Sequence, residues 1–318
     1  IGLLNTLKRL KINQFEIDEY LSLKIRDNFT KQYGEAVHPE SQTRTDGRET
    51  PFVVVTPVLN GERFLEQAIE SVLTQKGDFF IEYFIKDGGS NDRTLTILEN
   101  CCKRILLGEV PLYCSGIRFR YESSGDNGLY DAVAYGFSKI NASRNDILTY
   151  INSDDYYIES AFEIADRVFL QIPQARWICG QISVVDEQDV GLLTPQFPLA
   201  YARKDIQDGL HDGRALNVIQ QEGVFWSREL YDTVGGINRA LTLAGDFDFW
   251  HRFSGHSELL ALSCNLAFFR SHPNQLSKQI NEYYDEVDHL NNQRNSTYSL
   301  AQKEFYSDDS RFWVGNKS

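Results

Sequence analysis

The sequence predicts an α/β fold with a mostly parallel central sheet and helices on both faces. From residue 51 onward, segments typical of strands alternate with segments typical of helices, as in chains that build parallel sheets. Each expected strand is followed by a cluster of polar residues. The chain has 318 residues, of which 42% are hydrophobic and 24% charged, enough for a large core in a globular protein.

The first 49 residues differ from the rest. Leu3, Leu4, Leu7 and Leu10 recur at helical spacing with basic residues between them, which predicts an amphipathic helix that packs on its own domain or lies on a membrane surface. We therefore expect three parts: an N-terminal helical extension and linker (1–49), a main domain (50–275) and a C-terminal helical segment (276–318).

The main domain begins with four expected strands, and a helix is expected after each of the first three. Residues 52–56 form a short apolar segment rich in β-branched side chains, as in a buried strand. The helix that follows carries apolar residues at helical spacing, and Asn60 is a candidate N-cap. Further strands are expected at 81–85, 118–122 and 147–151, and further helices at 95–105 and 129–140.

Polar residues gather at the ends of these strands, at Thr56, Asp87, Asp126 and Asp154. In open α/β sheets the carboxyl ends of the strands form the ligand crevice. The sequence therefore predicts one binding site along this edge.

The last of these strands ends in two adjacent carboxylates, Asp154 and Asp155. Carboxylate oxygens suit Mg²⁺ or Mn²⁺, which proteins often hold together with substrate phosphates. An acidic turn with no metal explains the pair equally well on its own.

The loop after the first strand, residues 56–61, matches neither the dinucleotide fingerprint nor the P-loop. A nucleotide would then be held by side chains. Asp87 could accept a hydrogen bond from a base, or simply begin the Asp-Gly-Gly turn.

Downstream, strands are expected near 177–180 and 182–185, and residues 220–226 mix amides with aromatics. Asp246 lies near an expected helix start, where an acid is either a dipole partner or a general base. His272 is either a turn residue or a metal ligand.

The net charge of −13 disfavours binding to nucleic acid. The five cysteines form no CxxC pair, and no apolar run approaches the length of a membrane span. We expect a cytoplasmic protein.

Five segments in order make the chain resemble the family 2 glycosyltransferases of the GT-A fold, especially bacterial ones that build O-antigen, capsule or exopolysaccharide. They are residues 54–60, 85–94, 126–132, 151–155 and 245–250.

The resemblance implies a role for each matching residue. Thr56, Pro57, Asp87 and Gly88 would bind the nucleotide, and Asp131 would lie beside the nucleotide–sugar. Asp154 would face the ribose or sugar, Asp155 would hold Mg²⁺ or Mn²⁺, and Asp246 would be the catalytic base. His272 lies outside the matching segments and is a second candidate ligand for the metal. Two positions depart from the family: Val58 replaces a common Tyr, and Gly245 replaces the Glu of the Glu-Asp motif. The second departure leaves Asp246 and Asp248 as alternatives for the base, of which we favour Asp246.

We therefore expect metal-assisted, inverting transfer of a sugar from a nucleoside diphosphate sugar to a hydroxyl of a glycan or lipid-linked glycan. Peripheral association with the inner membrane face and homo-oligomers are compatible with this reading. The rival classes are a non-catalytic nucleotide- or carbohydrate-binding protein on the same fold and a sugar nucleotidyltransferase.

Overall fold

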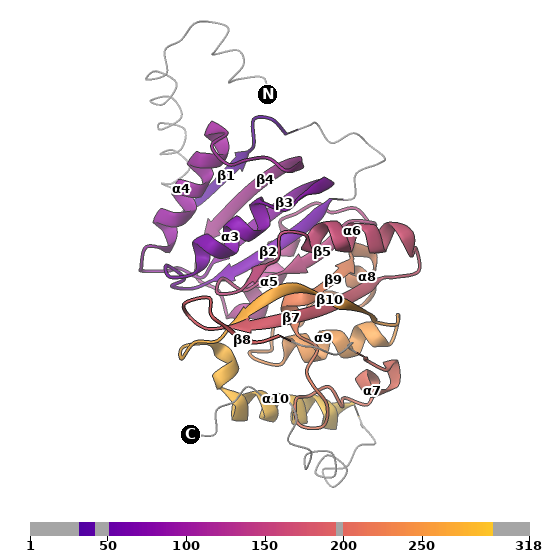
Figure 1. The fold of residues 1–318 in the computed structure, drawn as a ribbon. Coiled ribbons are helices and arrows are strands. Elements are labelled where there is room, and N and C mark those ends of the chain that lie inside the picture. The colour runs from indigo at the N-terminus through magenta and orange to yellow at the C-terminus, as the bar shows by residue number, and fades with distance from the viewer. Residues whose placement is uncertain (1–31, 42–50, 195–199, 295–318) are drawn as a thin grey trace, which may run out of the picture.

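The computed structural model describes residues 32–41, 51–194 and 200–294. Their strands form one sheet of ten, in the order β1-β4-β3-β2-β5-β9-β7-β10-β6, with β8 paired to β7 (Figure 1). The strands are β1 (Tyr33–Val37), β2 (Phe52–Val58), β3 (Gly77–Asp87), β4 (Cys114–Ser123), β5 (Ile147–Tyr150), β6 (Tyr156–Tyr157), β7 (Trp177–Val185), β8 (Gly191–Leu193), β9 (Val224–Ser227) and β10 (Leu260–Arg270).

The first half of the sheet is parallel, because β4, β3, β2 and β5 all run in one direction. β2 is buried on both faces, and its side chains alternate between two cores. Phe52 and Val54 pack in one core with α3 (Leu65–Leu73), α4 (Thr94–Leu107) and α6 (Ala161–Gln171). Val53 and Val55 pack in the other with α5 (Leu129–Ser138), α8 (Arg228–Thr233) and α9 (Gly245–Ser254). The predicted fold class, with helices on both faces, is confirmed.

The second half of the sheet is mixed. β9 runs antiparallel to both β5 and β7, whereas β10 runs parallel to β7. The short helix α7 (Arg203–Gln207) contacts α9, and two 3₁₀ turns lie at η1 (Gln221–Gly223) and η2 (Leu276–Lys278). The C-terminal helix α10 (Ile280–Gln293) also packs on α9, where Val287 and Leu290 join Ala244 and Phe247 in a small third core.

Three local expectations differ from the structure. Residues 33–37, expected in the helical extension and linker, form the edge strand β1, antiparallel to β4; the expected helix around Leu3–Leu10 lies outside the described residues. Asn60 does not cap α3, which begins at Leu65; its side chain accepts a hydrogen bond from the Asn91 backbone N–H (3.0 Å) across the loop. The two strands expected between 177 and 185 are the single strand β7.

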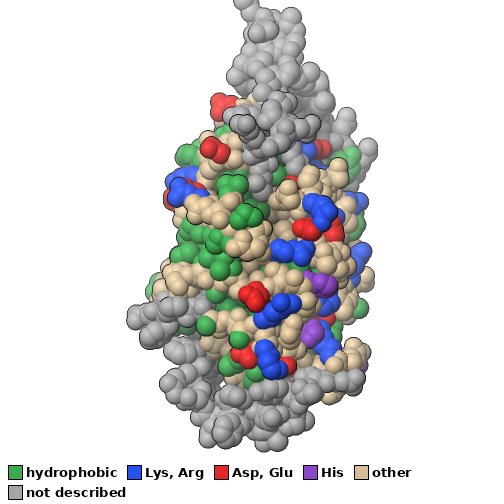
Figure 2. Space-filling view, turned by 90° about the vertical axis from the view of Figure 1, so that its right-hand side faces the viewer, with side chains coloured by type: hydrophobic (Ala, Val, Ile, Leu, Met, Phe, Trp, Pro, Cys, Tyr) green, Lys and Arg blue, Asp and Glu red, His purple; other side chains and the backbone are tan. Residues whose placement is uncertain are grey.

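Two observations describe the surface of the described residues: the character of their helices and the charge of the face drawn in Figure 2. None of the helices in the described part of the chain combines the length and apolarity needed to cross a membrane. On the face drawn in Figure 2, acidic side chains of the described residues lie among the lysines and arginines. This face therefore offers mixed charge to any partner.

Candidate functional site

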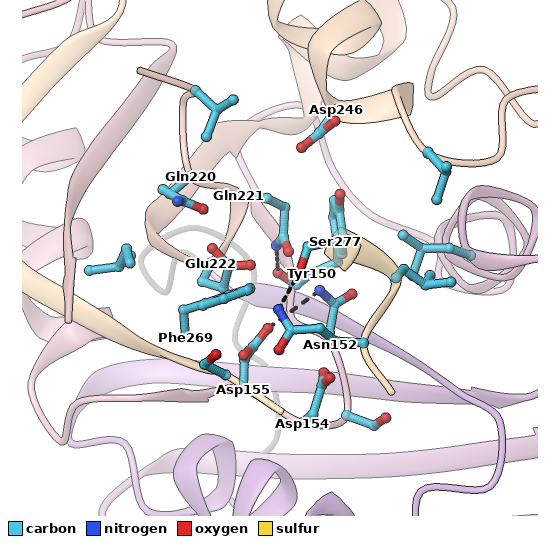
Figure 3. Close-up of a pocket in the computed structure, with 18 of the residues that line it drawn as sticks. Tyr150, Asn152, Asp154, Asp155, Gln220, Gln221, Glu222, Asp246, Phe269 and Ser277 are labelled. Atoms are coloured by element: carbon cyan, nitrogen blue, oxygen red, sulfur yellow. Dashed lines mark hydrogen bonds between the residues drawn. The ribbon is translucent and has the colours of Figure 1, made fainter. Parts of the chain in front are cut away.

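A cavity of about 1590 Å³ opens at the carboxyl ends of β2 and β5. Its walls come from β7, from residues 200–222, from the start of α9 and from residues 269–283. Pro57, Asp154, Asp155, Asp246 and His272 all line it, so five of the predicted site residues meet in one place (Figure 3).

The cavity wall carries a paired carboxylate and imidazole. Asp154 follows β5 and His272 follows β10, and the distance between Asp154 Oδ2 and His272 Nε2 is 2.8 Å. The Asp154 side chain is 27% exposed and that of His272 11%, so both can be reached from the cavity.

Asp155 also lines the cavity, but its carboxylate is held by the protein itself. Its side chain is buried, and Oδ1 accepts a hydrogen bond from the backbone N–H of Arg270 (2.8 Å). Burial raises the pKa of Asp155 well above its ordinary value, and the nearby Asp154 and Glu222 raise it further. Asp155 therefore fixes the end of β10 against the loop that carries Asp154.

Arg270 ties this loop to its surroundings and was not singled out from the sequence. Its buried guanidinium donates to the backbone oxygens of Asp154 (3.1 Å) and Asp186 (2.9 Å), and to Gln67 Oε1 (2.6 Å) and Asp189 Oδ1 (2.8 Å). A buried arginine with several acceptors holds those segments in a fixed relation. The sequence signal that could have pointed to Arg270 is its position two residues before the candidate ligand His272.

Asp246 reaches the cavity from the first turn of α9. The Tyr130 hydroxyl lies 3.3 Å from its Oδ1 and 2.9 Å from the backbone oxygen of Leu243, and can donate to either. Burial raises the pKa of Asp246 to about 6. A carboxylate whose pKa lies near neutrality is suited to accept a proton during a reaction.

Asp248 is placed differently. Its carboxylate is bound by Arg252 (2.8 Å from Nε to Oδ2) and by Arg294 (2.5 Å), it is buried, and it does not line the cavity. The geometry thus favours Asp246 over Asp248 as the group that acts on a ligand.

Steric crowding explains why position 245 is a glycine. A Cβ atom there would lie 2.6 Å from the ring of Tyr130, closer than side-chain carbons approach one another. Because Tyr130 also positions Asp246, a side chain at 245 would disturb the site. The departure from the Glu-Asp motif therefore reflects local packing.

Helix α10 holds the loop before Asp246. Glu286 accepts hydrogen bonds from the backbone N–H groups of Thr242 (2.9 Å), Leu243 (2.9 Å) and Ala244 (2.8 Å). An acid at the start of α9 also complements the helix dipole. Nothing in the sequence indicated this contact, because it joins residues more than forty positions apart.

Between Asp154 and Asp246 lies a polar wall that we name the Gln-Glu wall: Asn152, Gln221 and Glu222 (Figure 3). Glu222 is 4% exposed and shares a hydrogen bond with Asp155. Burial raises the pKa of Glu222 to about 7, and the charges of Asp246 and Asp154 contribute to the rise. The sequence showed only that amides cluster here.

Four predicted nucleotide-binding residues do not line the cavity. Thr56 is fully buried, with its hydroxyl 2.9 Å from that of Tyr83. Asp87 is also buried and accepts from the Ser90 backbone N–H (3.1 Å) and the Ser123 hydroxyl (2.5 Å). They shape the strand ends, and their direct contact with a nucleotide stays a prediction.

Gly88 and Asp131 support neighbouring segments. The Gly88 backbone N–H donates to the Val58 oxygen (2.8 Å), and a Cβ at Gly88 would lie 3.0 Å from the Asp126 carboxylate. Asp131 accepts from the backbone N–H of Asn127 (3.0 Å) and from Arg239 Nε (2.6 Å). These hydrogen bonds, first that of Asn127, lower the pKa of Asp131.

Comparison with known proteins agrees with this architecture. Residues 53–183 match the model described as glycosyl transferase family 2. An uncharacterized glycosyltransferase of Rickettsia conorii is 24% identical over 245 residues, which is 74% of this chain. The chain spans about 37% of the length of the curated relatives it matches.

Solved structures share the fold. S. aureus TarS 1–349 in complex with UDP-GlcNAc superposes with a TM-score of 0.57 at 15% identity, covering 81% of this chain and 70% of that one. The mannosyltransferase PcManGT from Pyrobaculum calidifontis, in complex with GDP-Man and Mn²⁺, gives 0.53 at 12% identity, covering 92% and 77%. The fold is thus that of GT-A proteins.

Proposed function

We propose that this chain, whose residues 53–183 match the model of glycosyl transferase family 2, transfers a sugar from a nucleoside diphosphate sugar to a hydroxyl acceptor with inversion. One observation supports this most: the Asp246 carboxyl, whose pKa burial raises to about 6, and the Asp154–His272 pair line one cavity, with the Gln-Glu wall between Asp154 and Asp246. Such a transfer needs a base for the acceptor proton and a centre that stabilises the departing diphosphate, which a metal ion on the pair would provide.

We propose that Asp154 and His272 hold a Mn²⁺ or Mg²⁺ ion together with the donor diphosphate. The described residues hold no group of three or more His, Cys, Asp or Glu side chains that could bind a metal, and the pair would supply two ligands. Divalent ions bound through one or two protein ligands and substrate phosphates are common. The distance of 2.8 Å between Asp154 Oδ2 and His272 Nε2 supports the proposal, because two ligand atoms of one ion lie close together. Asp155, which the resemblance implied, fits less well because Arg270 occupies its carboxylate.

Side chains of the protein take up the proton of the acceptor hydroxyl and orient the base that receives it. As the acceptor oxygen forms a bond to the anomeric carbon, its proton passes to Asp246, and the electron pair of the breaking carbon–oxygen bond leaves with the diphosphate. The metal, when bound, supplies Lewis-acid stabilisation of that diphosphate. Tyr130 orients Asp246 through the hydroxyl that lies near Oδ1. A single displacement with one base inverts the anomeric centre.

The rival functions have less support. A sugar nucleotidyltransferase would need a glycine-rich phosphate loop after the first strand, and residues 56–61 provide none. A non-catalytic binding protein drew its support from Gly245, which the packing of Tyr130 explains. We further propose that the acceptor is a glycan or lipid-linked glycan reached from the cytoplasmic face of a membrane.

The proposed function predicts selective stabilisation by one nucleotide. The apparent melting temperature should rise with one of UDP, GDP, CDP or dTDP, and rise more with Mn²⁺ or Mg²⁺ present, because a ligand that binds only the folded state stabilises it by mass action. Thermal-shift measurements with each nucleotide, with and without metal, check this. Nucleoside monophosphates serve as controls, since they lack the diphosphate. If none of the four nucleotides raised the melting temperature, the proposal would be contradicted.

Replacing Glu286 with glutamine should reduce turnover by about tenfold while leaving nucleotide affinity unchanged. The amide keeps an oxygen for the loop, but loses the charge that helps to raise the pKa of Asp246. The acidic limb of the kcat profile should therefore move to lower pH. Glu282→Gln, on the same helix, is the matched control. An unchanged pH profile in Glu286→Gln would exclude a positioning role for Glu286.

A further inference from the structure

The wall between the proposed base and the proposed metal pair is the place where a transferred sugar must lie, and this inference rests on the proposed function. Glu222 interacts electrostatically with both Asp246 and Asp154 and shares a hydrogen bond with Asp155. Glu222, Asp246 and Asp154 all line the same cavity. Figure 3 shows the same arrangement, with Gln221 and Glu222 between Asp246 and Asp154.

The wall presents hydrogen-bond acceptors that lack donors. Within the described structure, Glu222 Oε2, Gln221 Oε1 and Asn152 Oδ1 are buried and have no hydrogen-bond partner. The orientation of each amide follows from its other contact: Gln221 Nε2 donates to the Tyr150 backbone oxygen, and Asn152 Nδ2 donates to Asp155 Oδ2 (3.4 Å). A buried acceptor without a donor is costly. Three of them together fit a ligand that brings several hydroxyl groups.

The charge of the wall is one-sided. The carboxyl groups of Asp154, Asp155, Glu222 and Asp246 all line the cavity. Among the described lining residues the lysine and arginine cations are Arg63 and Lys278; Arg63 is paired with Glu187 (2.8 Å), and Lys278 is exposed. A sugar that carries its own carboxylate would therefore bury it beside other carboxyl groups, and the wall itself contains no lysine or arginine to compensate.

We infer that the Gln-Glu wall binds the hydroxyl groups of the transferred sugar and that Glu222 makes the enzyme select a neutral sugar over a uronic acid. Glu222 is then a specificity-determining residue: its carboxylate accepts hydrogen bonds from sugar hydroxyls and repels an acidic substituent. The nucleotide and the diphosphate are bound elsewhere, so their affinity does not depend on Glu222.

Isothermal titration with matched donors tests the inference. The pairs are UDP-glucose with UDP-glucuronate, GDP-mannose with GDP-mannuronate, and dTDP-glucose with dTDP-glucuronate, beside UDP, GDP and dTDP alone. For the nucleotide that binds, the neutral donor should bind the wild-type protein at least tenfold more tightly than the acidic one. Glu222→Gln should reduce that ratio below about threefold, mainly by strengthening the uronate. Because glutamine is isosteric with glutamate, unchanged affinity for the nucleoside diphosphate shows that the variant is folded.

Asp205→Asn is the matched control, since it removes a carboxylate from the same cavity but from α7, and it should keep the wild-type ratio. The inference is overturned if the uronate donor binds the wild type as tightly as the neutral one, or if Glu222→Gln keeps the full discrimination. If none of UDP, GDP, dTDP and CDP binds, the proposed function itself fails and the inference falls with it. The two failures are therefore distinguishable.

Discussion

Asp246→Asn is expected to lower the rate of sugar transfer by about 10²–10⁴-fold while leaving the affinity for donor nucleotide within about twofold. The amide is isosteric and still lines the cavity, but it cannot accept the acceptor proton. Initial rates of nucleoside diphosphate release, measured with the donor that the nucleotide screen identifies, check the rate, and calorimetry checks the affinity.

The matched control is Asp248→Asn, two residues along the same helix. Asp248 is engaged by Arg252 and Arg294 and faces away from the cavity, so its loss should reduce stability and leave the turnover of folded protein within about tenfold. If Asp248→Asn removed transfer and Asp246→Asn did not, the assignment of the base would be reversed.

The same carboxyl sets the pH dependence. Burial raises the pKa of Asp246 to about 6, above its value in an unfolded chain. Activity that needs the ionised form should therefore fall as pH drops below about 6. For stability the sign is opposite: a carboxyl with a raised pKa favours the folded state most when protonated, and that contribution is lost as pH rises from about 4 through 6. Asp246→Asn should then be more stable than wild type at pH 8, by on the order of 1–3 kcal/mol, and equal to it near pH 4.

The sequence predicted the parallel half of the sheet well because β2, β3 and β5 are buried on both faces and read as continuous apolar runs. It predicted the positions of Asp154 and Asp246 because Asp154 follows a strand and Asp246 begins a helix, and both of these element ends reach the same cavity. β1 escaped prediction because an edge strand of five residues, with Tyr33, Glu35 and Val37 exposed, has little pattern of its own. Its existence depends on pairing with β4.

The residues that hold the site residues in place were harder to predict than the site residues themselves. Arg270, Glu286 and Tyr130 act on residues more than forty, and often more than a hundred, positions away. Local spacing carries no information about such contacts. For the same reason the sequence could not separate Asp154 from Asp155. The two are adjacent in the chain, but Asp155 is engaged by the backbone of Arg270 and Asp154 by the side chain of His272.

The different surroundings of Asp154 and Asp155 predict different effects of their substitution on metal-dependent nucleotide binding. Asp154→Ala should remove the metal-dependent part of nucleotide affinity, a loss of roughly 100-fold or more, because it deletes a carboxylate that we propose binds the ion. His272→Ala should act in the same direction. Asp155→Asn should retain most of the metal dependence, since the amide oxygen can still accept from the Arg270 backbone N–H.

The measurement is nucleotide titration across a Mn²⁺ series, read as the metal concentration at half-maximal enhancement. Affinity in the presence of EDTA should be the same for wild type and all three variants, which separates loss of metal from loss of fold. The opposite result, in which Mn²⁺ no longer enhances nucleotide binding to Asp155→Asn but still enhances binding to Asp154→Ala, would identify Asp155 as the metal ligand. Because Asp155 is buried, that result would also require the end of β10 to move when donor binds.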